Sequence, residues 1–206
     1  MYTHKLPTDD ELTALSDWHR GRTKFGLWYV QITCPDVLAH CCANRQKLTT
    51  LLAPNYHRQF HVTVFVGGFW VANKVYDDEM TWQDVGRQVE ALSRLGRRVI
   101  RPFYLTLSNL CAFDNCVVIK TRHSDELHRI RHALSMVHGE IAPGHYVPHV
   151  TLGFYQDSFL KADVLEVLRG VPCRPMSFGV DKLTFGYYQA TQGQGRLTDV
   201  MVWDLR

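Results

Sequence analysis

Two tripeptides of the sequence combine side chains that can perform acid–base chemistry on a phosphate ester. They read His-Val-Thr at residues 61–63 and again at residues 149–151. The ordinary pKa of imidazole is about 6.5, so near neutral pH one histidine can accept a proton while the other donates one. Threonine hydroxyls can donate hydrogen bonds to phosphate oxygens on which charge accumulates. His61, Thr63, His149 and Thr151 thus contain the groups that in-line displacement at phosphorus requires.

The tripeptide alone is weak evidence because it is short. With 11 histidines and 15 threonines in 206 residues, chance supplies about 0.8 copies of His-x-Thr. Requiring Val, Leu or Ile at the second and fourth positions lowers that expectation to about 0.04. Both copies meet the requirement, with Val64 and Leu152 in fourth place. A single copy would favour a structural histidine whose hydrogen bonds are satisfied on a sheet face. The matched pair favours a functional site instead.

The spacing of each motif predicts a β-strand. Residues two apart on a strand point to the same face, so His and Thr share a face while the aliphatic residues between them enter the core. Because the motifs lie far apart in the sequence, they can cooperate only if the two halves of the chain pack together. The same parity predicts that Phe65 and Tyr155 share the motif face, where they could stack on a base or ribose. The alternative is that both aromatic residues pack in the sheet.

Helices and strands interleave without the regular alternation of a doubly wound sheet, which predicts an α+β fold of mostly antiparallel sheet. Thr8 with Glu11 predicts a capping box at the first helix, and Gly96 the end of the third. The order strand, helix, His-x-Thr strand recurs in each half and indicates a pseudo-duplicated domain of two lobes. Helices are predicted at 8–20, 35–52, 81–95, 124–138 and 159–169, and strands at 25–33, 60–67, 103–112, 116–121, 147–155, 176–188 and 198–205.

Bulk properties exclude little. A net charge of +3 does not diagnose nucleic-acid binding, although it suits an anionic ligand. The charged N-terminus and the lack of a long apolar run favour a cytoplasmic protein that does not bind a membrane. In that compartment the six cysteines are expected to be free thiols, with a Cys111–Cys116 disulfide as the less favoured alternative.

The motif blocks resemble those of the 2H phosphoesterases, a family that includes 2′-5′ RNA ligase-like proteins and cyclic nucleotide phosphodiesterases. The first block is FHVTVFVGGF at residues 60–69, and the second is VPHVTLGFY at residues 147–155. The resemblance covers residues 25–206 and implies one bilobal domain, with residues 1–24 as an N-terminal helical extension. It implies two pseudo-symmetric lobes of antiparallel sheet with outer helices, which form a central cleft where the two motifs face each other. It also implies catalysis without a metal ion or other cofactor.

Carried over residue by residue, the resemblance implies that His61 and His149 are catalytic and that Thr63 and Thr151 bind the substrate phosphate. By analogy His149 is the base in hydrolysis and His61 the acid, with the roles exchanging in the reverse direction. The implied substrate is a 2′,3′-cyclic nucleotide phosphate, or a related RNA 3′-end or 2′-5′ phosphodiester, and no obligatory protein partner is implied. The alternatives are a module that binds a nucleotide or RNA end without turnover, and a scaffold domain that binds no phosphate ester.

One position departs from the family pattern. Many RNA ligase-like members carry a basic residue three positions after the second Thr, where this sequence has Phe154. Other candidates are weaker: His128 and His132 with nearby His123 have helical metal-ligand spacing, but a solvated helix face is the favoured interpretation. The remaining candidates for contact with a ligand are Arg97, Arg98, Arg101, Trp70, Tyr146, Tyr187 and Tyr188.

Overall fold

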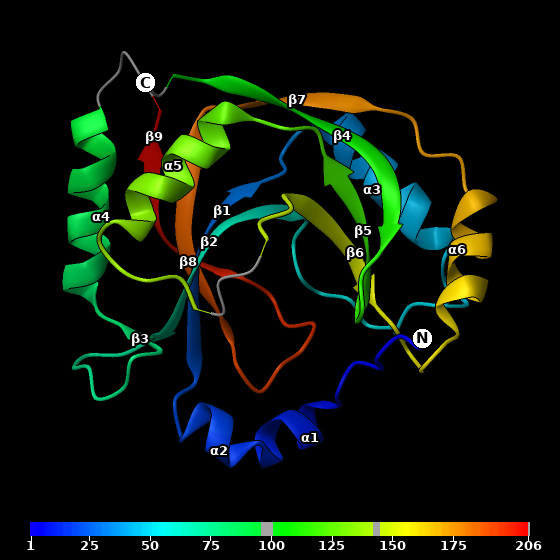
Figure 1. Cartoon of the computed structure of the whole chain (residues 1–206), viewed down its shortest axis with the longest axis horizontal. Helices are drawn as coiled ribbons and strands as arrows, with labels where there is room; N and C mark the ends of the chain where they lie inside the picture. Colours follow the sequence, from blue (N-terminus) through cyan, green and yellow to red (C-terminus); the bar gives the residue numbers. More distant parts are fainter. Residues whose placement is uncertain (96–100, 142–144, 206) are drawn as a thin grey trace.

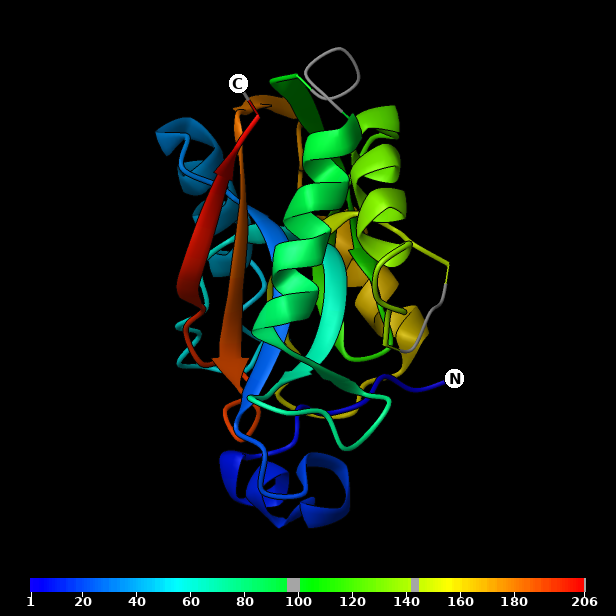
Figure 2. The same ribbon diagram turned by 90° about the vertical axis from the view of Figure 1, so that its left-hand side faces the viewer.

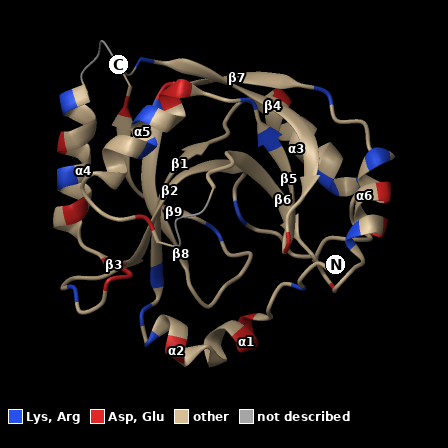
Figure 3. Cartoon of the chain, in the orientation of Figure 1, with Lys and Arg blue, Asp and Glu red and all other residues tan. Residues whose placement is uncertain are grey.

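The computed structural model describes residues 1–95, 101–141 and 145–205 (Figure 1). Gly96, predicted to end the third helix, lies outside the described residues, as do Arg97 and Arg98. No helix among the described residues is long and apolar enough to cross a lipid bilayer. Charged residues are concentrated on the helices and loops, while the central strands carry few (Figure 3).

The scaffold is one curled sheet whose main path is antiparallel throughout, in the order β7-β4-β5-β6-β2-β1-β8-β9 (Figures 1 and 2). The short strand β3 pairs with β2 in parallel. The strands are β1 Lys24–Gln31, β2 His61–Trp70, β3 Glu79–Met80, β4 Phe103–Ala112, β5 Cys116–Thr121, β6 His149–Phe154, β7 Met176–Val180, β8 Lys182–Gln189 and β9 Thr198–Asp204. The mostly antiparallel α+β fold predicted from the sequence is confirmed.

The helices are α1 Asp9–Ala14, α2 Ser16–His19, α3 Pro35–Gln46, α4 Trp82–Leu95, α5 Asp125–Ser135 and α6 Lys161–Arg169. The capping box of Thr8 and Glu11 is present. The single helix predicted over residues 8–20 is nevertheless wrong, because Leu15 leaves the helical region at ψ 53° and separates α1 from α2. The helix predicted over residues 35–52 ends at Gln46, after which the chain forms turns.

The predicted strand 176–188 is two strands, of which β7 forms one edge of the sheet and β8 lies next to the opposite edge strand, β9. β7 pairs with β4, whereas β8 pairs with β1, and only Asp181 lies between them. A one-residue connection between strands so far apart in the sheet order requires the sheet to curl until these regions approach each other. The curl is therefore a property of the chain path.

The sheet consists of two matching halves, which we call the first lobe (β2, β1, β8, β9) and the second lobe (β6, β5, β4, β7). Each lobe contains one strand–helix–strand unit, β1-α3-β2 or β5-α5-β6, that ends in a His-x-Thr strand. The helices cross over, since α3 contacts β6 and α5 contacts β2. Each motif strand is therefore covered by the helix of the other lobe.

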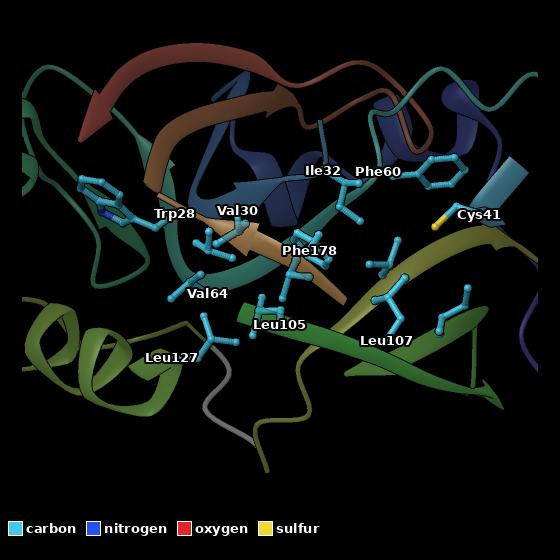
Figure 4. Close-up of a cluster of buried hydrophobic side chains, with 14 of the residues drawn as sticks. Trp28, Val30, Ile32, Cys41, Phe60, Val64, Leu105, Leu107, Leu127 and Phe178 are labelled. Carbon is cyan, nitrogen blue, oxygen red and sulfur yellow. The ribbon is translucent and has the colours of Figure 1, made fainter. Parts of the chain in front are cut away.

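The core lies between the sheet and these helices (Figure 4). The aliphatic residues inside and after the motifs, Val62, Val64, Val150 and Leu152, are 0% exposed and belong to one continuous cluster. Full burial of such a side chain contributes about 1.5–3 kcal/mol. The aliphatic positions of the motifs thus anchor both strands and leave the opposite face for polar side chains.

Candidate active site

The two motif strands are neighbours at the junction of the lobes. β2 and β6 run antiparallel with Val62 opposite Val150. In this register Thr63 lies across from His149, and His61 lies across from Thr151. The structure thereby brings together the four side chains that sequence analysis selected, on the face opposite the core.

Both histidine rings are held in the same way. Nδ1 of His61 lies 2.7 Å from the carbonyl oxygen of Gln59, and Nδ1 of His149 lies 2.6 Å from that of Val147. Because a carbonyl only accepts hydrogen bonds, each Nδ1 carries the proton. Nε2 of each ring is then the nitrogen that can exchange a proton with a ligand.

Aromatic neighbours fix the plane of each ring. Tyr29 packs edge-on against His61 with centroids 5.5 Å apart, and Phe113 packs edge-on against His149 at 4.8 Å. The Tyr29 hydroxyl donates to Asp199, which holds the Tyr29 ring in place. Both imidazoles are thus oriented before any ligand binds, which is a condition for efficient acid–base catalysis.

Burial lowers the pKa of both histidines. His61 is 8% exposed, and loss of hydration lowers its pKa to about 4. The bond to Gln59 opposes this shift, while the charges of Arg58 and His149 reinforce it. Burial also lowers the pKa of His149, with a further contribution from Lys120. In the free protein both rings favour the neutral form, and a bound phosphate anion would favour the protonated form.

Two hollows meet at the motifs. A cavity of about 200 Å³ is lined by His61, Thr63 and Thr151, together with Val66 and Phe154. A larger groove of about 1140 Å³ is lined by His149 and again by Thr63 and Val66. A phosphate beside Thr63 would therefore have the small cavity on the His61 side and the open groove on the His149 side.

The prediction that Phe65 and Tyr155 face the ligand is wrong. Both side chains are 0% exposed and belong to the core. The reason is a β-bulge after each motif threonine, because the pairing skips Val64 in β2 and Leu152 in β6. One inserted residue reverses the alternation of faces.

The same bulges bring different side chains to the ligand face. Val66 and Phe154, each three positions after a motif threonine, line the small cavity. The position that is basic in many family members therefore faces this cavity, where the chain presents an uncharged phenyl ring.

Two tyrosines connect the lobes at the motifs. The Tyr56 hydroxyl, from the loop before β2, donates to the Thr151 carbonyl at 3.0 Å. The Tyr146 hydroxyl, from the segment before β6, donates to the Thr63 carbonyl at 2.9 Å. Each lobe thus braces the motif strand of the other lobe. The sequence indicates Tyr146 only as a candidate to border the cleft, and Tyr56 belongs to no periodic pattern that would have predicted its role.

Replacing Tyr56 by phenylalanine is expected to lower the free energy of unfolding by about 1–3 kcal/mol, because the Thr151 carbonyl loses its hydroxyl donor. Urea denaturation followed by circular dichroism measures this difference. Tyr104→Phe is the matched control, since Tyr104 is 77% exposed. Equal stability of the Tyr56 variant and the wild type would show that the bond contributes nothing.

Arg58, which was not among the residues predicted from the sequence, lines the small cavity with His61. Its guanidinium lies 4.2 Å from the ring centroid of Tyr188, another lining residue. Burial lowers the pKa of Arg58 and raises that of Tyr188. The only signal in the sequence was a basic residue three positions before the first motif histidine.

The other candidates lie elsewhere. Trp70 and Tyr187 pack together at 5.7 Å with Lys24 above both rings, and neither lines the two hollows. His123 stacks on His128 at 4.8 Å. Within the described residues, no three His, Cys, Asp or Glu side chains are placed to hold a metal ion. Arg101 is exposed, and all six cysteines, including Cys111 and Cys116, are free.

The sheet has two lobes, and each lobe contributes one His-x-Thr strand to a shared hollow. The sequence model of the 2′-5′ RNA ligase superfamily matches residues 40–192, well over half of the chain. The chain belongs to the 2′-5′ RNA ligase superfamily, which confirms its resemblance to the 2H phosphoesterases.

Solved structures share this fold at low sequence identity. E. coli LigT complexed with 3′-AMP matches with a TM-score of 0.56 and 16% identity, over 89% of this chain and 98% of LigT. LigT complexed with NADP+ matches with a TM-score of 0.53 and 16% identity, over 88% and 98%. TT0787 of Thermus thermophilus matches with a TM-score of 0.54 and 14% identity, over 88% and 98%. Among curated proteins, none matches the chain.

The lowered histidine pKa values predict an acidic optimum for any reaction that uses both rings. The base must be neutral, so the rate falls below its pKa, and the acid must be protonated, so the rate falls above its pKa. With the pKa of His61 at about 4 and that of His149 below its usual value, kcat/KM should peak below pH 6.5.

The measurement is kcat/KM and kcat for a 2′,3′-cyclic nucleotide between pH 4 and 9. A phosphate anion bound beside the two rings would raise both pKa values, so the kcat profile should lie at higher pH than the kcat/KM profile. A kcat/KM maximum above pH 7 would contradict the prediction.

Proposed function

We propose that this protein is a metal-independent phosphodiesterase that hydrolyses a 2′,3′-cyclic nucleotide phosphate or a related RNA-end or 2′-5′ phosphodiester. The observation that carries the proposal is the matched pair of histidines, each with Nδ1 bonded to a carbonyl two residues earlier. This leaves two Nε2 atoms for proton transfer beside two threonine hydroxyls. One ring then serves as base and the other as acid.

In the proposed reaction, one histidine takes a proton from a water molecule while the water oxygen forms a bond to phosphorus. The bond from phosphorus to the ribose oxygen breaks, and the other histidine donates a proton to that oxygen. Thr63 and Thr151 donate hydrogen bonds to the non-bridging oxygens as charge accumulates. The reverse sequence of proton transfers exchanges the two histidine roles.

The electrostatics support one assignment of these roles. His61 is more deeply buried than His149 and has the strongly lowered pKa. The neutral form of His61 therefore persists to lower pH, which favours His61 as base and His149 as acid in the free protein. This is the reverse of the assignment made by analogy with the family.

The proposed partner is a nucleotide or an RNA 3′-end. LigT structures contain 3′-AMP and NADP+, which supports nucleotide binding by the shared fold. The groove of about 1140 Å³ offers room for a nucleoside beyond the phosphate. Its lining includes Phe113 and Tyr146, aromatic residues of the kind on which bases stack, and Lys5, a cation suited to phosphate.

The test is incubation of the purified protein with 2′,3′-cyclic nucleotides and 2′-5′ oligoadenylate in EDTA. Product formation that survives chelation is the expected result. Saturable binding without product would contradict the enzymatic proposal and show that the protein is a binding module. No binding of any phosphate ester would indicate a scaffold domain. Folding is checked by circular dichroism in each case.

A further inference from the structure

The small cavity beside His61 lacks a cation at the position where many family members have a basic residue. Phe154 occupies that position and lines the cavity. A phenyl ring can donate no hydrogen bond to a phosphate oxygen. The negative charge of the proposed substrate must therefore be met from another part of the fold.

Arg58 is placed to do this from the opposite lobe. It precedes the first motif strand and lines the same cavity as His61, Thr63 and Thr151. Its charge also contributes to the lowered pKa of His61, which is a second sign that the two groups are close.

The contacts of Arg58 orient its guanidinium without neutralising it. Nε donates to the Gly195 carbonyl at 3.1 Å, and Nη2 donates to the Gln192 carbonyl at 3.4 Å. The plane lies over the ring of Tyr188. In the described parts of the chain, Arg58 forms no ion pair and Nη1 has no hydrogen-bond partner. A half-buried cation without a counterion is costly unless an anion joins it.

We propose that Arg58 binds the phosphate of the substrate and supplies the cationic contact that Phe154 cannot make. The inference rests on the proposed function and names the group that recognises the phosphate. A guanidinium presents N–H donors in a rigid plane that matches phosphate oxygens. The carbonyls of Gln192 and Gly195 hold this plane in position, so the loop after β8 takes part in substrate binding.

The first test compares Arg58→Met, Arg58→Lys and the control Arg94→Met. Arg94 is an exposed helix residue that does not line the cavity and forms a surface ion pair with Glu90. Arg58→Met is expected to weaken binding of inorganic phosphate, measured by calorimetry, by about 10–100-fold. Arg58→Lys should lose less, because it keeps the charge without the planar fork. Arg94→Met should match the wild type.

A second readout separates ligand binding from a merely structural role. Removing the Arg58 charge should raise the pKa of His61, measured by NMR titration of the imidazole resonances without any ligand. In the wild-type protein, added phosphate should shift the guanidinium N–H resonances of Arg58, those of Nη1 above all. This measurement needs no variant and still applies if Arg58→Met fails to fold.

The outcomes distinguish the two proposals. Turnover in the wild type with equal phosphate affinity in wild type and Arg58→Met would overturn the role of Arg58 and leave the proposed function standing. Phosphate binding that depends on Arg58, without turnover of any ester, would support the role of Arg58 in phosphate binding and contradict the proposed phosphodiesterase activity. Guanidinium N–H resonances of Arg58 that do not move when phosphate shifts those of His61 and His149 would also overturn the inference.

Discussion

Replacing either His61 or His149 by alanine is expected to lower kcat for hydrolysis of a 2′,3′-cyclic nucleotide by about 10²–10⁴-fold. Each variant removes one Nε2 from the pair that transfers protons, while the carbonyls of Gln59 and Val147 lose only a donor. Because the two rings act in the same step, the double variant should lose little more than the worse single variant. Steady-state kinetics in EDTA, with product analysis by chromatography, measures the effect.

A control histidine separates this effect from a general change in charge. His123→Ala removes an exposed ring that pairs with Asp125 outside the two hollows, and it should retain wild-type kcat. Full activity in either His61→Ala or His149→Ala would refute the site.

A phosphodiester with a 4-nitrophenolate leaving group distinguishes the acid from the base. This leaving group needs no protonation, so the variant that lacks the acid should recover much of its activity, whereas the variant that lacks the base should not. The lower pKa of His61 predicts recovery in His149→Ala. Recovery in His61→Ala alone would instead support the assignment made by analogy.

The second large effect is expected at Arg22, within residues 1–24, the segment that the family resemblance predicts to be an N-terminal extension. Its side chain is 8% exposed and pairs with Asp78 and with Glu79, which is 3% exposed. The guanidinium also lies 3.9 Å from the ring centroid of Phe69. Removing one partner of a buried ion pair leaves a charge without compensation. Arg22→Met is therefore expected to lower the free energy of unfolding by about 3–5 kcal/mol.

Chemical denaturation of Arg22→Met and Arg94→Met tests this prediction. Arg94 pairs with Glu90 on the surface, where both side chains are mostly exposed, so its loss should cost at most about 0.5 kcal/mol. The double variant Arg22→Met, Glu79→Gln should recover part of the loss, because the uncompensated carboxylate is gone. A loss below about 1 kcal/mol in Arg22→Met would show that the ion pairs of Arg22 do not anchor residues 1–24 to the rest of the protein.

The sequence by itself determined the local features, since each of them depends on neighbouring residues. The two His-x-Thr strands, the hairpin of β4 and β5 and the capping box of Thr8 all follow from periodicity and turn chemistry, and the structure has each of them. The pairing of the lobes followed from the repeated element order and from the family resemblance.

Only the tertiary structure decided which side chains reach the ligand. The bulges at Val64 and Leu152 arise from pairing with neighbouring strands, so they are absent from the strand's own alternation. They bury Phe65 and Tyr155 and direct Val66 and Phe154 to the cavity.

Tyr56 and Arg58 lie in a loop without a periodic pattern, and their partners lie roughly a hundred residues or more away in the sequence. Their roles exist only once the curled sheet brings the two lobes and the loop after β8 together. Local periodicity therefore predicted which residues carry the acid–base groups. Long-range strand pairing determined which side chains face the ligand and which cation lies beside them.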